Sequence, residues 1–371
     1  MSPPYANILS STPAMTPFVG PETIERRRGR KFRWRLGANE SAFGISPKVK
    51  AAMAAELDLV SWYCDPEHYD LRRKLAALLG VGIGNLVVGE GIDGLLGLIV
   101  RAFADPGDAI VTSAGAYPTF NYHVIGYGGR LEFVPYGTDC RNDIEALVDR
   151  VTQTNAKLLY LANPDNPTGT FLGRGAIEHV LGRLPATCVL VLDEAYVEFA
   201  PPDDLPPIDA GDPRLIRLRT FSKAHGMAGL RVGYGIAAEE IIAAFDKIRL
   251  HFGVGRLSQI AAAASLDDPG FAAGVVHQVA EGRAEYEATA RSLGIETMSS
   301  LTNFVPFDMG DGQRSERMVA LLDERDVFVR KPGVAPLDRF VRVTVGTAEE
   351  RAGFAQAYQD AVQVLRAETG G

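Results

Sequence analysis

The chain has 371 residues, of which 46% are hydrophobic and 23% charged, and its formal net charge is −8 at pH 7. This length suits one large domain and a smaller one, because single hydrophobic cores stop growing at roughly 250–300 residues. The acidic balance argues against nucleic acid or an anionic membrane as a partner. The cysteine spacing of Cys64, Cys140 and Cys188 argues against a disulfide framework or a zinc site. Because neither a signal peptide nor a bilayer-length apolar run is visible, we expect a cytoplasmic protein.

The first part of the chain predicts an irregular arm over residues 1–35, rich in proline at first and basic later. The basic run at 26–31 is typical of a solvated segment or an intersubunit contact. Helical spacing of apolar residues follows over 47–57 and again over 70–79, where Gly80 provides a natural C-terminal stop.

Short apolar strands then alternate with helices. The predicted strands are 85–88, 109–112, 130–135, 157–162, 188–192, 215–218 and 231–236, and the predicted helices are 95–103, 143–151 and 175–184. This order favours a largely parallel sheet covered on both faces, with its ligand site at the carboxyl ends of the strands.

After residue 250 the pattern changes to long helices over a few short strands. The predicted helices are 257–266, 271–293, 314–325 and 348–365, and the predicted strands include 327–330 and 340–345. This indicates a second, smaller α/β domain. We therefore expect an arm over 1–35, a large domain over 45–255, and a small domain made of 36–44 and 256–371.

Side chains that could take part in catalysis follow the ends of the predicted strands. Lys223 comes shortly after strand 215–218, flanked by small hydroxyl residues. Asp193 follows the strongly apolar strand 188–192, and a carboxylate at so buried a place requires a cationic partner. Tyr196 lies in the same loop. Taken singly, Lys223 has the appearance of a surface lysine, and a helix N-cap is the alternative for Asp193, so the argument depends on their combination.

Two further loops offer donors and an anion cradle. Asn166 lies between two prolines and a glycine that fix the backbone of residues 163–169. The glycine-rich turn 89–94 precedes a helix, so its amides can form an anion site, although it does not match the dinucleotide-binding spacing. The candidate phosphate ligands are Gly91, Ile92 and Asp93 in this turn, together with Thr220, Ser222 and Arg231 near Lys223.

These groups together match what pyridoxal 5′-phosphate (PLP) requires of a protein. PLP needs an amine for its aldehyde, a carboxylate at its pyridine nitrogen, donors to its phenolic oxygen, a phosphate cradle and a plate on the ring face. Phe120 is the candidate plate. The combination predicts a PLP enzyme, with Lys223 forming the imine.

The ordered set of motifs resembles the class I and II, fold-type I PLP aminotransferases, and within them the histidinol-phosphate aminotransferase-like branch. The matching stretches are 36–41, 63–72, 89–94, 118–120, 163–169, 193–199, 220–234, 303–305 and 342–347. The resemblance implies the aspartate aminotransferase-like fold. That fold has a large PLP-binding domain, with a mostly parallel seven-stranded sheet flanked by helices, and a smaller C-terminal α/β domain.

The resemblance also implies roles for single residues. The catalytic set is the Schiff-base lysine Lys223, the pyridinium partner Asp193, and Tyr196. Asn166 and Tyr196 would donate to the phenolic oxygen, and Thr220, Ser222 and Arg231 would hold the phosphate. The implied substrate-binding residues are Asn39, Arg330 and Arg342, of which Arg342 would grip an anionic end. Tyr63 would reach the partner subunit's cofactor, which implies a homodimer with shared active sites.

The implied reaction is transfer of an amino group by a ping-pong mechanism. The donor would be histidinol phosphate or an aromatic amino acid, and the acceptor a 2-oxo acid such as 2-oxoglutarate. Ile92, Gly94 and Phe120 depart from the residues usual in the family, which leaves the donor open. Two alternatives remain: a PLP lyase or decarboxylase on the same scaffold, and a non-catalytic binding protein. A dehydrogenase has little support.

Overall fold

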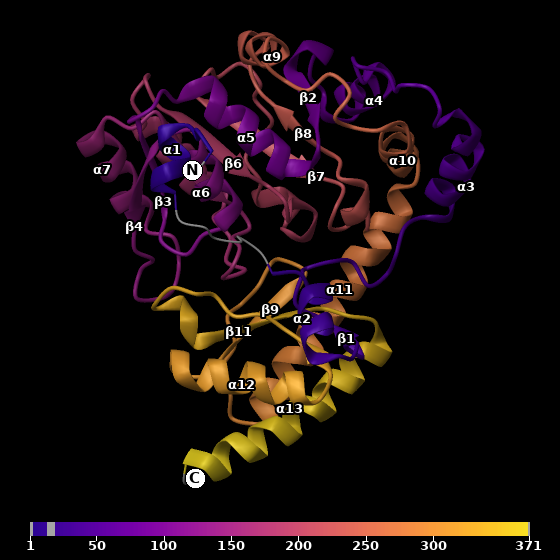
Figure 1. Cartoon of the computed structure of the whole chain (residues 1–371), viewed down its shortest axis with the longest axis vertical. Coiled ribbons are helices and arrows are strands. Elements are labelled where there is room, and N and C mark those ends of the chain that lie inside the picture. The colour runs from indigo at the N-terminus through magenta and orange to yellow at the C-terminus, as the bar shows by residue number, and fades with distance from the viewer. Residues whose placement is uncertain (1–2, 13–18, 370–371) are drawn as a thin grey trace.

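The computed structural model describes residues 3–12 and 19–369, and a seven-stranded sheet forms its largest layer (Figure 1). Its strands lie in the order β2-β8-β7-β6-β5-β3-β4. Their bounds are β2 Leu86–Gly89, β3 Ala109–Ser113, β4 Arg130–Val134, β5 Leu158–Ala162, β6 Val189–Asp193, β7 Leu215–Thr220 and β8 Gly233–Ile236. Within this sheet only β8 runs antiparallel to its neighbours, so the prediction of a mostly parallel sheet is confirmed.

Helices cover both faces of this sheet. On one face, apolar residues of α5 (Gly91–Phe103), α6 (Pro118–Gly126) and α9 (Glu239–Asp246) pack against alternate strand residues. On the other face, α7 (Ile144–Thr154) and α8 (Arg174–Arg183) bury the remaining strand residues. Burial on both faces explains why β5 and β6 are almost entirely apolar in sequence.

A third core lies beside β2 and β8. It is built by α3 (Pro47–Ala55), α4 (Tyr69–Leu79) and α10 (Arg256–Leu266). Short 3₁₀ turns connect the elements of the chain: Leu57–Leu59, Ile83–Asn85, Val197–Phe199, Pro202–Asp204, Ala228–Leu230 and Leu337–Arg339.

Most of the remaining elements form the lower part of Figure 1. There β9 (Phe304–Asp308) pairs antiparallel with β11 (Phe340–Thr344), and β1 (Trp34–Arg35) pairs parallel with β10 (Val327–Phe328). The helices α11 (Pro269–Ser292), α12 (Gly312–Glu324) and α13 (Ala348–Thr369) pack around these strands in a core of their own. The expected domain boundaries stay a prediction.

Three local expectations were wrong. The arm is not irregular throughout, because it contains α1 (Asn7–Ser11), α2 (Pro21–Arg28) and β1. Helix α5 begins at Gly91, not four residues later, since the glycines of the turn obscured the helical pattern. Strand β8 begins only at Gly233, because Arg231 has a φ of 51°.

The basic run of the arm packs on the end of α12. Arg28 donates to the carboxylate of Asp326 at 2.7 Å, and the Nε of Arg30 lies 3.1 Å from the same carboxylate. Within the described ranges, none of the helices combines the length and apolar character that crossing a membrane requires.

Candidate active site

Lys223 lies half-buried just beyond β7 and points to the segment before α3. Its Nζ donates a hydrogen bond of 2.9 Å to the carbonyl oxygen of Asn39 and lies 5.5 Å from the ring centroid of Tyr196. The Tyr196 hydroxyl in turn accepts from Nδ2 of Asn39 at 2.8 Å. Lys223 and Tyr196, two of the predicted catalytic residues, are thus both hydrogen-bonded to Asn39.

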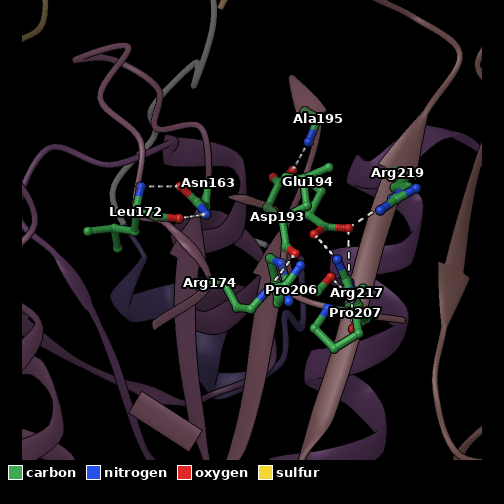
Figure 2. Close-up of polar contacts among 11 residues, drawn as sticks. Asn163, Leu172, Arg174, Asp193, Glu194, Ala195, Pro206, Pro207, Arg217 and Arg219 are labelled. Carbon is green, nitrogen blue, oxygen red and sulfur yellow. Dashed lines mark hydrogen bonds and ion pairs between the residues drawn. The ribbon is translucent and has the colours of Figure 1, made fainter. Parts of the chain in front are cut away.

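Asp193 is the last residue of β6 and is 4% exposed. Its carboxylate accepts hydrogen bonds from the Tyr160 hydroxyl at 2.8 Å and from the Ala195 amide at 3.0 Å (Figure 2 shows the latter). Burial raises its pKa to about 6, although both hydrogen bonds act in the opposite direction. A buried carboxylate whose hydrogen-bond donors are neutral fits a cationic partner, such as the protonated nitrogen of a pyridine ring.

Phe120, the predicted plate, is fully buried in α6. Its ring stacks on that of Tyr160, with centroids 4.5 Å apart and an interplanar angle of 17°. Tyr160 therefore connects the predicted plate to Asp193. We did not predict Tyr160, because a tyrosine in the middle of an apolar strand has the appearance of an ordinary core residue.

The glycine-rich turn at the start of α5 lies against Arg231. Gly91 has a φ of 74°, a conformation that favours glycine, and a Cβ there would lie 2.7 Å from Nη2 of Arg231. The first amides of α5 have no partner within the helix, which suits an anion. The guanidinium of Arg231 contacts the carboxylate of Asp93 at 3.2 Å, and the Tyr117 hydroxyl donates to Asp93 at 2.9 Å. The side chain of Ile92 is buried in the core, so only its amide is available to a ligand.

The two hydroxyl residues predicted to hold the phosphate, Thr220 and Ser222, lie next to each other at the end of β7. The Thr220 hydroxyl donates to the Ser222 hydroxyl at 2.9 Å and accepts from the Ser222 amide at 3.0 Å. Both residues are buried. Hydroxyls, helix amides and the Arg231 guanidinium are donors of the kind that a phosphate group takes.

The loop 163–169 presents Asn166 to Arg342. Nη1 of Arg342 donates to Oδ1 of Asn166 at 2.5 Å. Two reciprocal hydrogen bonds of 2.8 Å between Asn163 and Leu172 close this loop (Figure 2). Inside it, the buried carboxylate of Asp165 accepts from the Thr168 hydroxyl at 2.6 Å. The loop is thus rigidly held, as its two prolines predict.

The two predicted substrate arginines lie on paired segments, since Arg330 and Arg342 form an antiparallel β-bridge. Arg342 also donates to the Gly37 carbonyl at 3.2 Å, and its guanidinium carbon lies 5.2 Å from the Phe304 ring. Arg330 donates to the Val19 carbonyl. Burial, together with the charge of Arg342, lowers the pKa of Arg330 to about 10. Tyr63 instead points to solvent, with 82% exposure, and its ring lies 4.9 Å from that of Phe252.

A buried ionic cluster is centred on Glu194, the residue that follows Asp193, and the sequence analysis does not predict it (Figure 2). Glu194 accepts from Arg217 at 2.5 and 3.1 Å and from Arg219 at 2.8 Å. Arg217 also donates to the carbonyls of Pro206 and Pro207. These arginines lower the pKa of Glu194 despite its burial. The signal was present in the sequence, because charges at alternate positions of β7 must lie on one face of the sheet.

Residues 34–357 match the model of the family described as aminotransferase class I and II. Histidinol-phosphate aminotransferase 2 of Carboxydothermus hydrogenoformans is 36% identical over 353 residues, covering 93% of this chain and 95% of that protein. The crystal structure of histidinol-phosphate aminotransferase from Sinorhizobium meliloti, in complex with PLP, has a TM-score of 0.94 and 44% identity and covers 98% of this chain and 99% of that chain.

Aspartate aminotransferase from Thermus thermophilus shares the fold, with a TM-score of 0.77 at 21% identity over 92% of this chain and 93% of that chain. The expected aspartate aminotransferase-like fold is therefore confirmed, and the residues around Lys223 and Asp193 fit PLP. The chain belongs to the class I and II aminotransferases and is a PLP-dependent aminotransferase of the histidinol-phosphate aminotransferase-like branch.

Proposed function

We propose that the enzyme transfers the amino group of histidinol phosphate to a 2-oxo acid, 2-oxoglutarate in the first instance, by a ping-pong mechanism. Two of the relatives named above, from Carboxydothermus hydrogenoformans and Sinorhizobium meliloti, support this donor, since they are histidinol-phosphate aminotransferases. Aromatic amino acids are the competing donors, and the assay described below distinguishes them.

The observation that carries the proposal is the pair of adjacent arginines in the site. Arg342 is directed at neutral groups, namely the Asn166 side chain, the Gly37 carbonyl and the Phe304 ring. Burial lowers its pKa. A desolvated guanidinium of this kind gains strongly from an anion. With Arg330 beside it, the site favours substrates that carry a phosphate or a second carboxylate.

When bound, PLP supplies an electron sink that makes the hydrogen on the substrate α-carbon acidic. Asp193 would hold a proton on the ring nitrogen, and Asn166 and Tyr196 would donate to the phenolic oxygen. Thr220, Ser222 and Arg231 would hold the phosphate. The amine of Lys223 would accept the proton from the substrate α-carbon, while Arg342 holds the anionic end in place.

We further propose a homodimer in which Tyr63 completes the partner's site. Support comes from exposed apolar side chains of two segments, 57–63 and 250–252, which the contact of the Tyr63 and Phe252 rings joins: Leu57, Val60, Trp62, Leu250 and Phe252. A patch of this kind is typical of an interface between subunits.

The test of the proposed function is a half-reaction assay. The purified enzyme is mixed with one amino donor at a time, and the conversion of its visible absorption is followed. Histidinol phosphate should convert it fastest, and 2-oxoglutarate should restore it. Lys223→Ala should abolish the conversion, whereas Lys50→Ala, on the exposed face of α3, should not. Faster conversion by an aromatic amino acid would contradict the proposed donor, and product release without any keto acid would indicate a lyase.

A further inference from the structure

Asn39 uses every one of its polar groups in hydrogen bonds. Its amide donates to the Thr344 hydroxyl at 3.0 Å, and that hydroxyl donates back to Oδ1 of Asn39 at 3.1 Å. Its Nδ2 donates to the Tyr196 hydroxyl at 2.8 Å. Its carbonyl accepts from Nζ of Lys223 at 2.9 Å and from Nδ2 of Asn303 at 3.0 Å. With 2% exposure, Asn39 is therefore a buried hub that touches two residues of the catalytic set.

The backbone of Asn39 has a φ of 55°, in the left-handed region. Few residues other than glycine adopt this conformation, and asparagine is among those that tolerate it best. It persists only where the surroundings fix it, and the two bonds to Thr344 do so here. The direction of the Asn39 carbonyl, and with it the place of the lysine amine, thus depends on Thr344.

The same segment also holds Arg342. Thr344 and Arg342 are two residues apart on β11, so their side chains share a face of that strand. The Thr344 amide donates to the Leu36 carbonyl at 2.8 Å, and Arg342 donates to the Gly37 carbonyl at 3.2 Å. Residues 36–39 therefore lie along β11, with Arg342 at one end and the amine of Lys223 at the other.

We propose that Asn39 is a positioning residue that holds the unbonded amine of Lys223 and the hydroxyl of Tyr196 in a fixed place relative to Arg342. This goes beyond the substrate contact that the family resemblance implies for Asn39. It rests on the proposed function in one respect, the proton transfer by Lys223. Through the segment 36–39, Asn39 keeps the amine of Lys223 at a fixed distance from an anion bound at Arg342.

The first experiment measures the lysine itself, without any substrate. The full-length chain is freed of cofactor and treated with a trace of acetic anhydride, and the acetylation rate of each lysine is read by peptide mapping. Asn39→Gly still permits the left-handed φ but loses the side-chain bonds that fix it, so the carbonyl that holds the lysine amine is no longer held in one direction. It should make Lys223 react roughly five- to tenfold faster, the equivalent of one neutral hydrogen bond, with the other lysines unchanged.

Two matched controls accompany it. Asn155→Gly changes another asparagine of positive φ, at the end of α7, and should leave the rate at Lys223 unchanged. Thr344→Val removes the hydroxyl that fixes Asn39 and should behave like Asn39→Gly, whereas Thr344→Ser keeps the hydroxyl and should behave like the parent. Since the Thr344 variants alter only a side chain, they decide the matter if Asn39→Gly does not fold. Equal rates at Lys223 in Thr344→Val and Thr344→Ser would overturn the proposal.

The second experiment uses the loaded enzyme and an amino donor deuterated at its α-carbon. Thr344→Val should lower kcat with little change in KM and should increase the kinetic isotope effect, because a loosely held lysine slows the proton transfer alone. Thr344→Ser should restore both. A rise in KM with an unchanged isotope effect would overturn the positioning role. An enzyme that shows no transamination but keeps the labelling differences would refute the proposed function and leave the hold on Lys223 intact.

Discussion

The Tyr160 hydroxyl donates a hydrogen bond of 2.8 Å to Oδ2 of Asp193 across the neighbouring strands β5 and β6. Both side chains are buried, and the bond helps to keep the carboxylate ionised, since it lowers the pKa that burial raises. Tyr160 therefore adjusts the pKa of Asp193, the residue that would face the cofactor nitrogen.

Tyr160→Phe should weaken cofactor binding at neutral pH. Phenylalanine preserves the ring that stacks on Phe120 but removes the donor, so the pKa of Asp193 rises further. We expect a loss of roughly fivefold in PLP affinity, the equivalent of one hydrogen bond to a charged or polar group. Titration of the cofactor-free enzyme with PLP measures it. Because the deficit arises from protonation, it should shrink as the pH is raised, and a deficit independent of pH would contradict this explanation.

The pH dependence of stability in the cofactor-free chain should contain a contribution from Asp193. Burial raises its folded-state pKa from 3.8 to about 6, so the folded state binds this proton more tightly than the unfolded state does. The stabilisation is present below about pH 4 and is lost as the pH rises through 6, by on the order of 3 kcal/mol. Asp193→Asn should remove it. Urea unfolding of both proteins from pH 4 to 7.5 checks the difference, and parallel curves would contradict the assignment.

Arg330 and Arg342 should divide the recognition of anions between them. Arg330→Gln should lower kcat/KM for histidinol phosphate roughly 10- to 100-fold, the range of one or two charge-assisted hydrogen bonds, with a much smaller effect on histidinol. Arg342→Lys keeps the charge but loses the planar fork, so it should impair the reaction with 2-oxoglutarate. Steady-state kinetics with the three substrates measure both. Equal losses on phosphorylated and unphosphorylated donors would argue against the role of Arg330.

Glu194→Gln should destabilise the fold severely. It leaves Arg217 and Arg219 buried without a carboxylate, a change that costs about 3–5 kcal/mol in comparable buried pairs. Glu368→Gln provides the matched control, because Glu368 pairs with Arg317 at the surface, where solvent screens the pair and its loss should change stability little. Chemical unfolding of both variants tests the contrast, and similar losses would show that burial is not the deciding factor.

A mixture of two inactive variants should recover activity if the site is shared between subunits. Lys223→Ala removes the amine of one site, and Tyr63→Ala removes the residue proposed to enter the partner's site. Unfolding and refolding them together allows mixed dimers, in which one of the two sites contains both native residues. Activity of the mixture against either variant alone is the measurement. A monomer by light scattering, or a mixture no more active than its parts, would exclude the shared site.

The sequence predicted those parts of the site that depend on local pattern. Asp193 ends a strand whose apolar character is unmistakable, and Lys223 comes shortly after another predicted strand. Parallel strands bring their carboxyl ends together whatever the distance along the chain. The start of α5 escaped prediction because glycine at positions 91 and 94 contradicts helix propensity. The contacts of Tyr160 and Asn39 escaped it for another reason, since they depend on which strands are neighbours and on one left-handed φ.

The reversal of β8 has a consequence for how this site can change. Thr220 at the end of β7 lies opposite Gly233 at the start of β8, so the chain between them leaves and re-enters the sheet at one edge. A parallel strand would have required a crossover to the far edge. Lys223, which carries the amine, and the cation Arg231 therefore lie on one loop whose two ends are fixed in adjacent strands. An insertion or deletion between the two would change the spacing of the amine and the cation, so we expect the length of this loop to be constrained by the site.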